Sequence, residues 1–135
     1  MPLVLDNSVV CGWLFADQAT PYSEAIARQL HADRAVAPPL LPMEYANVLR
    51  TACKRGKLTA LQAQEAITAL SALPVEIDQD APNAGQLLAL ALRYDLTSSG
   101  AAYLDLALRR QLPIATRDDA LAQAARVAGV GVVDA

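Results

Sequence analysis

Short apolar segments recur along the chain, separated by longer stretches in which apolar residues return every three or four positions. The clearest segments are residues 3–5 (LVL), 35–37 (AVA), 74–77 (PVEI) and 113–115 (PIA). Each is followed by a polar residue or a proline, which is typical of a short buried strand. Residues 130–133 (VGVV) are a candidate fifth strand.

The stretches between these segments have helical spacing. Thr20 before Pro21 is a typical helix start, with Thr as the N-cap and Pro at the first helical position. Gly56 ends a helical pattern as a C-cap does, and Thr59 caps the next one. The predicted helices span about 8–15, 21–30, 41–55, 60–70, 81–93 and 98–110, and a last one begins at Asp118.

Strands that alternate with helices predict a parallel sheet covered by helices on both faces. The sequence therefore predicts an α/β fold with a central parallel sheet of four or five strands. No internal repeat, low-complexity tract or linker divides the sequence, so we expect one domain over residues 1–135.

Composition and charge narrow the function classes. Hydrophobic residues make up 54% of the 135 residues and charged residues 19%, as in a folded globular chain. No apolar run is long enough to span a membrane and no signal sequence is recognisable, so we expect a cytoplasmic protein. Cys11, Cys53 and the single histidine His31 lack zinc-site spacing, and we expect both cysteines to be unpaired packing residues. The net charge of −3 argues against a protein that coats nucleic acid, but not against a nuclease.

Three acids fall where parallel sheets place their ligand sites, at the carboxyl ends of the strands. Asp6 directly follows the first strand, Glu44 lies in the first turn of the helix after the second, and Asp118 follows the fourth. Carboxylates gathered there repel one another unless a hard cation such as Mg²⁺ or Mn²⁺ lies between them. Such an ion can polarise a phosphate and activate a water for in-line attack.

Each acid also has an ordinary structural interpretation. Asp118 is a good helix N-cap, and Glu44 early in a helix complements the macrodipole. Asp6 is harder to explain in that way, because a carboxylate at the end of a buried strand needs a partner. The shared placement of the three, more than any single one, favours a metal site.

These residues lie in three motifs, which are 4–9 (VLDNSV), 38–49 (PPLLPMEYANVL) and 112–118 (LPIATRD). In order and spacing the motifs resemble those of the PIN-domain family, and in particular those of the VapC toxins of bacterial toxin–antitoxin pairs. The resemblance implies a three-layer PIN-like sandwich and a metal-dependent endoribonuclease with Asp6, Glu44 and Asp118 as catalytic metal ligands. It also implies an RNA substrate, a cognate antitoxin and a homodimer.

One position departs from the family pattern. Similar proteins carry a further Asp near the start of the helix after Leu96, where this chain has Gly100. The resemblance therefore implies that one metal ligand is missing and that cleavage is weakened. Asp105 lies about 140° around the same helix and cannot replace it. Asp105 is expected either to pair with Arg109 at i+4 or to lie at the edge of the metal site.

Other residues are candidates for supporting roles. Ser8 resembles the family's small hydroxyl residue near the metal and is also an ordinary N-cap. Asn47 and Thr116 are candidates to hydrogen-bond the acids. The basic residues Arg50, Lys54, Arg55 and Arg117 are candidates to bind RNA phosphates, although the first three equally suit a solvated helix end.

Rival functions make different demands. A haloacid dehalogenase-type phosphatase would need a second acid where Ser8 stands and a lysine far downstream, but Lys57 is the last lysine. The serious alternative is a catalytically impaired PIN-fold module that binds antitoxin or RNA without cutting. Metal affinity and RNA cleavage distinguish that module from an enzyme.

Overall fold

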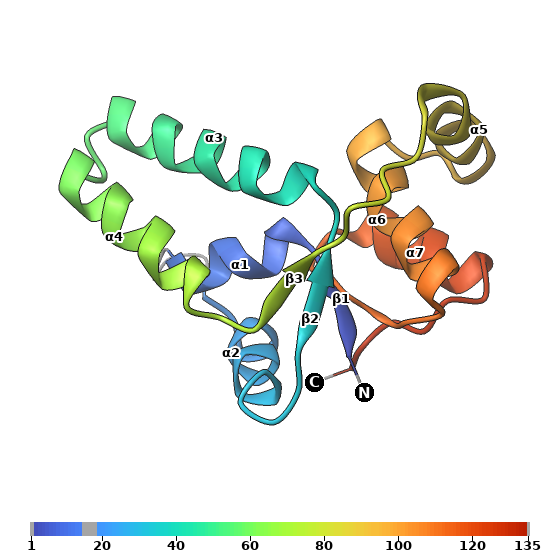
Figure 1. The fold of residues 1–135 in the computed structure, drawn as a ribbon, viewed down its shortest axis with the longest axis horizontal. Helices are drawn as coiled ribbons and strands as arrows, with labels where there is room; N and C mark the ends of the chain where they lie inside the picture. Colours follow the sequence, from blue (N-terminus) through green and yellow to red (C-terminus); the bar gives the residue numbers. More distant parts are fainter. Residues whose placement is uncertain (1, 15–18, 135) are drawn as a thin grey trace.

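The computed structural model describes residues 2–14 and 19–134, and its centre is a four-stranded parallel sheet with the order β3-β2-β1-β4 (Figure 1). The strands are β1 Leu3–Leu5, β2 Ala35–Ala37, β3 Val75–Ile77 and β4 Ile114–Ala115. The α/β prediction is confirmed. A fifth strand over 130–133 is wrong, because only an isolated bridge joins Ile114 to Val132 there.

Helices fill the connections. They are α1 Asn7–Leu14, α2 Pro21–Gln29, α3 Leu40–Lys54, α4 Ala60–Ser71, α5 Ala84–Tyr94, α6 Ser98–Arg110 and α7 Asp119–Val127. Thr20 and Thr59 are the N-caps of α2 and α4, as predicted, and each forms a reciprocal capping box with the residue three positions on. Within the described residues, no helix is long and apolar enough to cross a membrane.

The predicted helix boundaries that fall on described residues lie within one residue of the observed ones, except at the start of α5. The helix expected from residue 81 begins at Ala84, because Asn83 is its N-cap and forms a capping box with Gln86. The first helix begins at Asn7, one residue earlier than predicted, and its expected last residue, Phe15, lies outside the described residues.

Alternating side chains on the strands build two separate cores. On β1, Leu3 and Leu5 face a core with Ile26 and Tyr45, while Val4 faces a second core with Tyr103. Helices α1 to α4 cover the first face and α6 and α7 the second, with α5 packed against α6 (Figure 1). Complete burial of a Leu or Ile side chain stabilises the fold by about 1.5–3 kcal/mol, so the two aliphatic cores fix the position of the sheet.

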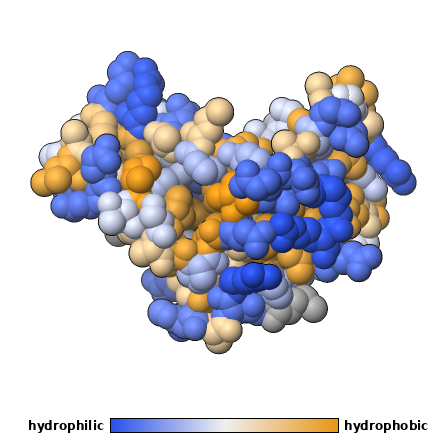
Figure 2. Space-filling view, viewed as in Figure 1, coloured by the Kyte–Doolittle hydropathy of each residue, from blue (hydrophilic) through white to orange (hydrophobic). Residues whose placement is uncertain are grey.

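The carboxyl ends of the strands all lie at one edge of the sheet. Asp6 follows β1 there, Asp78 follows β3, and Thr116 follows β4. The space-filling view shows the surface hollowed between the lobe of α3 and α4 and the lobe of α5 (Figure 2). The fold thus carries Asp6 and the starts of α3, α6 and α7 to the same edge.

Candidate active site

Asp6 is the innermost of the predicted ligands. Its side chain lies at the end of β1 and only 7% of its surface is exposed. The Ser8 hydroxyl donates to Asp6 Oδ2 at 2.8 Å, and the Thr116 hydroxyl donates to the same oxygen at 2.6 Å. The supporting roles predicted for Ser8 and Thr116 therefore correspond to direct hydrogen bonds to Asp6, whereas the N-cap interpretation of Ser8 is wrong, because α1 already begins at Asn7.

Backbone donors fix the direction of both hydroxyl groups. The Arg117 N–H donates to Ser8 Oγ at 2.9 Å, and the Asp118 N–H donates to Thr116 Oγ1 at 3.0 Å. Because each hydroxyl accepts from a backbone amide, its own proton is directed to Asp6. The turn after β4 thus holds the carboxylate at the end of β1 in one orientation.

Asp118 has the helix-capping role that its ordinary structural interpretation predicts. It is the N-cap of α7, and its Oδ1 accepts from the N–H groups of Ala120 at 2.9 Å and Leu121 at 3.3 Å. Its negative charge also acts on Asp6 and raises the pKa of that carboxyl. The N-cap interpretation is therefore correct, and it leaves Asp118 close enough to Asp6 for the two charges to interact.

Glu44 reaches the same region from the second turn of α3, not from the first turn as predicted, because α3 already begins at Leu40. Its side chain is half-buried, and the Tyr103 hydroxyl of α6 donates to Glu44 Oε1 at 2.7 Å. Burial raises the pKa of Glu44, and the charge of Asp6 adds to the increase, while the Tyr103 hydrogen bond opposes it. We refer to Asp6, Glu44 and Asp118 together as the acidic site.

The negative charge of Asp6 is not balanced by a basic side chain in the described part of the chain. Burial raises the pKa of Asp6, the hydrogen bonds from Thr116 and Ser8 lower it, and the charge of Asp118 raises it again. In the described part of the chain no basic side chain contributes to this shift. A buried carboxylate held by hydroxyls and faced by other acids is an environment that favours a cation.

The donor chemistry of the site fits a divalent cation. Carboxylate and carbonyl oxygens are the ligands that Mg²⁺ and Mn²⁺ take. The Oδ1 atom of Asn7, next to Asp6, is buried and has no hydrogen-bond partner in the structure. Among the described residues, however, no three Asp, Glu, His or Cys side chains form a closed group around one point.

Gly100 is the third residue of α6, at the end of the helix that faces the site. Its N–H donates to the N-cap Thr97 at 3.1 Å, and its backbone lies one helical turn before Tyr103. A Cβ at this position would meet Leu96 and Thr97 at 3.5 Å, an ordinary van der Waals distance. The backbone therefore accepts a side chain here, and glycine is not required by the packing.

Of the remaining sequence-predicted residues, Asn47 and the basic ones are exposed, and only Arg117 adjoins a member of the acidic site in the sequence. Asn47 is exposed on α3. Arg50, Lys54 and Arg55 are exposed along the distal half of α3, and the helical rise puts Arg50 about 9 Å and Lys54 about 15 Å beyond Glu44 along the axis. Arg117 is exposed directly beside Asp118.

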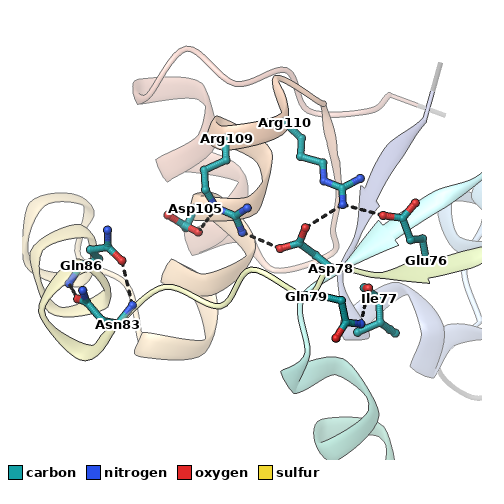
Figure 3. Close-up of polar contacts among 9 residues, drawn as sticks. All are labelled: Glu76, Ile77, Asp78, Gln79, Asn83, Gln86, Asp105, Arg109 and Arg110. Carbon is teal, nitrogen blue, oxygen red and sulfur yellow. Dashed lines mark hydrogen bonds and ion pairs between the residues drawn. The ribbon is translucent and has the colours of Figure 1, made fainter.

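Asp105 belongs to a different group of charges. Its Oδ2 accepts from Arg109 at 2.8 Å, which confirms the predicted i,i+4 pair. Figure 3 shows that the same Arg109 also reaches Asp78, whose side chain is 2% exposed. Arg110 donates to Asp78 at 2.8 Å and to Glu76 at 2.6 Å. We call these five residues the ion-pair cluster.

The ion-pair cluster ties α6 to the end of β3. Burial alone would raise the pKa of Asp78, but hydrogen bonds from Arg109 and Arg110 hold it below its usual value. Asp78 is not predictable from the sequence pattern, because its partners lie 31 and 32 positions downstream. Tyr103 was not predicted as a site residue either, although it lies three residues after Gly100 and so shares its helix face.

Comparisons with known proteins agree with this architecture. A family model described as "PIN domain" matches residues 3–127. The crystal structure of PAE2754 from Pyrobaculum aerophilum is similar, with a TM-score of 0.69 at 18% sequence identity over 92% of this chain and 79% of that chain. At that identity the structural likeness concerns the fold alone. No curated protein matches the sequence.

Proposed function

The chain belongs to the PIN domain family, and from that premise we propose that it is a metal-dependent endoribonuclease of the VapC toxin kind. PIN domains are generally metal-dependent nucleases. The observation that carries the proposal is Asp6, a buried carboxylate that is held by two hydroxyls and lies within range of the charges of Asp118 and Glu44. RNA is the proposed substrate, and Mg²⁺ or Mn²⁺ the proposed cofactor.

The chemistry divides between the cation and the side chains. When bound, a divalent cation would polarise the scissile phosphate and lower the pKa of the attacking water. Ser8 and Thr116 keep Asp6 oriented as the central ligand. Glu44 and Asp118 each use one carboxylate oxygen in the hydrogen bonds described above, and the second oxygen is the proposed donor to the cation.

Gly100 reduces what the site offers to the cation. Glycine brings no carboxylate to the start of α6, so three acids carry the proposed metal site where related motifs carry four. Less negative charge means weaker cation binding and a less well-held water. We therefore propose that cleavage by this chain is weak, although its fold and its hydroxyl supports are intact.

Basic residues on two sides of the site are the proposed RNA contacts. Arg117 adjoins Asp118, where it is suited to a phosphate at the cut site. Arg50, Lys54 and Arg55 lie farther out along α3, where they are suited to flanking phosphates. Contacts of this kind hold the strand without reading its sequence, so they leave the RNA target open.

An antitoxin is a further part of the proposal. A cavity of about 800 Å³ lies between α1, α2, α3 and α4, and most of its lining is apolar. Trp13, Tyr45 and Leu70 contribute to its wall, and Glu24 and Arg28 add charges from α2. An apolar groove of this kind suits the apolar face of a partner helix.

A homodimer is proposed on separate grounds. Helix α5 has no buried residue, and its Leu88 and Leu92 are 59% and 76% exposed. Two large apolar side chains one helical turn apart form a face that a second copy can cover. Replacing both with Gln is expected to convert a dimer into a monomer in sedimentation equilibrium.

The second candidate function is a PIN-fold module that binds RNA or antitoxin without cutting. Two observations favour it: Gly100 lacks the acid expected at its position, and the described acids do not form a closed group of three. The enzyme and the module share a fold and differ in what they do with metal and RNA.

The test compares cleavage of a mixed RNA pool by this chain, by Gly100→Asp and by Gly100→Ala. Each is assayed with Mn²⁺, with Mg²⁺ and with a chelator. The Ala variant adds a Cβ and improves helix propensity without adding a carboxylate, so it separates the acid from the packing effect. We expect weak metal-dependent cleavage by this chain, no gain in the Ala variant, and a gain of about tenfold or more in the Asp variant.

Three outcomes would count against parts of this proposal. If this chain and the Asp variant cut equally well, the remaining acids suffice and Gly100 is not a lesion. If only the Asp variant cuts, this chain is the binding module. If this chain and the Asp variant are both folded but neither binds nor cuts RNA, the ribonuclease function itself is wrong.

A further inference from the structure

Tyr103 joins α6 to the acidic site, and the inference drawn from it rests on the proposed metal-dependent function. Its side chain is 1% exposed, yet its hydroxyl reaches Glu44, which is 59 positions away in the sequence, and donates to Oε1 at 2.7 Å. The contact therefore connects helix α6, which lacks an acid at Gly100, with helix α3, which supplies one.

The ring of Tyr103 is fixed by packing. It belongs to the core that also contains Val4 and Val36 of the sheet and Leu104 of its own helix. A buried ring in a close-packed core has essentially one orientation, so its hydroxyl oxygen has one position. Glu44, by contrast, is a half-buried side chain with three rotatable bonds, and its carboxylate needs an external contact to be held in place.

We propose that Tyr103 is a positioning residue for Glu44. It holds Oε1 so that Oε2 is presented to a divalent cation shared with Asp6. Partners of this kind, which orient a ligand without touching the metal, typically contribute 10–100-fold to metal affinity. Tyr103 is then the contribution that α6 makes to the site in the absence of an acid at Gly100.

The test measures Mn²⁺ affinity by electron paramagnetic resonance and by calorimetry, with no RNA present. Tyr103→Phe removes only the hydroxyl, and we expect it to weaken Mn²⁺ binding about tenfold, both in this chain and in Gly100→Asp. Tyr45→Phe is the matched control, because the buried Tyr45 hydroxyl donates to the Ala66 carbonyl oxygen at 3.0 Å, in the other core. It removes a comparable buried hydrogen bond, and we expect Mn²⁺ affinity to be unchanged.

A double-mutant cycle separates positioning from a general effect on the fold. In a Glu44→Gln background, Tyr103→Phe should change Mn²⁺ affinity less than it does in the parent chain, because the ligand that it positions has been altered. Equal weakening in both backgrounds, or equal weakening by Tyr45→Phe, would overturn the proposal. Tighter binding by Tyr103→Phe would overturn it too, since the hydroxyl would then be holding Glu44 away from the cation.

Failure of the positioning role and failure of the proposed function have different signatures. If the parent chain and Gly100→Asp bind Mn²⁺, and Tyr103→Phe binds it equally well, the positioning role alone is wrong. If neither the parent chain nor Gly100→Asp binds Mn²⁺, the metal-dependent function is wrong and the positioning role is lost with it.

Discussion

The acidic site and the ion-pair cluster both place a buried carboxylate at the carboxyl end of a strand, but they treat its charge in opposite ways. Asp78, after β3, is 2% exposed and is held by Arg109 and Arg110, which keep its pKa below the usual value. Asp6, after β1, is 7% exposed and is held by two hydroxyls, and its pKa is raised.

This difference in how the two carboxylates are held distinguishes a structural ion pair from a proposed ligand site. At Asp78 the protein supplies both charges, so the interaction is complete and joins α6 to the sheet. At Asp6 it supplies negative charge without a basic partner among the causes of the pKa shift, and in the proposed function a divalent cation supplies the opposite charge. Burial of an uncompensated carboxylate costs stability, and a fold retains such a group where a ligand recovers the cost.

Replacing Asp78 or Asp6 with asparagine should change the free energy of unfolding in opposite ways. This is the largest effect that we expect. Asp78→Asn leaves two arginines without their carboxylate, and it should lower the free energy of unfolding by about 2 kcal/mol, less than for a fully buried pair because both arginines are partly exposed. Asp6→Asn removes an uncompensated charge, so metal-free stability should stay equal or rise. Urea unfolding with a chelator measures both values.

Mn²⁺ binding should be lost in the variant that keeps its stability and retained in the variant that loses stability. Asp6→Asn is expected to abolish Mn²⁺ binding and RNA cleavage, whereas Asp78→Asn should retain both at temperatures where it is folded. Loss of Mn²⁺ binding in a folded Asp78→Asn protein would break the distinction between the two regions.

The basic residues provide the next comparison, because the arginines of the ion-pair cluster are already occupied. Arg50→Gln combined with Lys54→Gln should reduce the slope of log affinity for single-stranded RNA against log salt by about 1.4, or about 0.7 for each lost phosphate contact. Arg110→Gln removes a cation that is bound to Asp78 and Glu76, and it should leave the slope unchanged. Fluorescence anisotropy without metal measures binding while preventing cleavage. An unchanged slope in the α3 double variant would assign its basic residues to helix stabilisation alone.

Stability should respond to pH in opposite directions in the two regions. The raised pKa values of Asp6 and Glu44 mean that the folded state binds their protons more tightly, so their destabilising effect fades as pH falls toward about 4. The lowered pKa of Asp78 means that its stabilising effect is complete above about 4 and is lost below that.

The same asparagine variants measure these opposite responses without metal. The stability difference between the parent chain and Asp6→Asn should shrink between pH 7 and pH 4. The difference between the parent chain and Asp78→Asn should persist over that range. A parallel decline of both differences would mean that the two carboxylates are in equivalent environments.

The sequence was sufficient for the features that depend on local chemistry. Short, mainly apolar segments predicted the four strands, and Asp6 was identified as a carboxylate that ends a buried strand. The start of α5 was also readable, because Asn83 and Gln86 have capping-box spacing, but the prediction began the helix near residue 81. The segment 130–133 failed as a strand because Gly131 interrupts an apolar run of four, and only Val132 bridges to the sheet.

Contacts between residues that lie far apart in the sequence could not be predicted from the sequence pattern. Asp78 resembles any polar residue after a strand until α6 brings Arg109 and Arg110 to it. The bond between Tyr103 and Glu44 likewise requires α3 and α6 to meet across the edge of the sheet. Periodicity identifies the faces of a helix, but it does not determine which side chain of another element lies opposite a given position.

The smallest expected effect concerns Asp105. The sequence predicted for it either a pair with Arg109 or a place at the edge of the metal site. Its pair with Arg109 is local and partly exposed, with 15% and 35% of the two side chains exposed. Asp105→Asn should therefore cost about 0.5 kcal/mol in urea unfolding and leave Mn²⁺ affinity unchanged. Asp80→Asn, at an exposed acid beyond the ion-pair cluster, controls for the change in net charge. If Asp105→Asn weakened Mn²⁺ binding severalfold and Asp80→Asn did not, Asp105 would belong to the edge of the acidic site. The acidic site and the ion-pair cluster would then share a residue of α6.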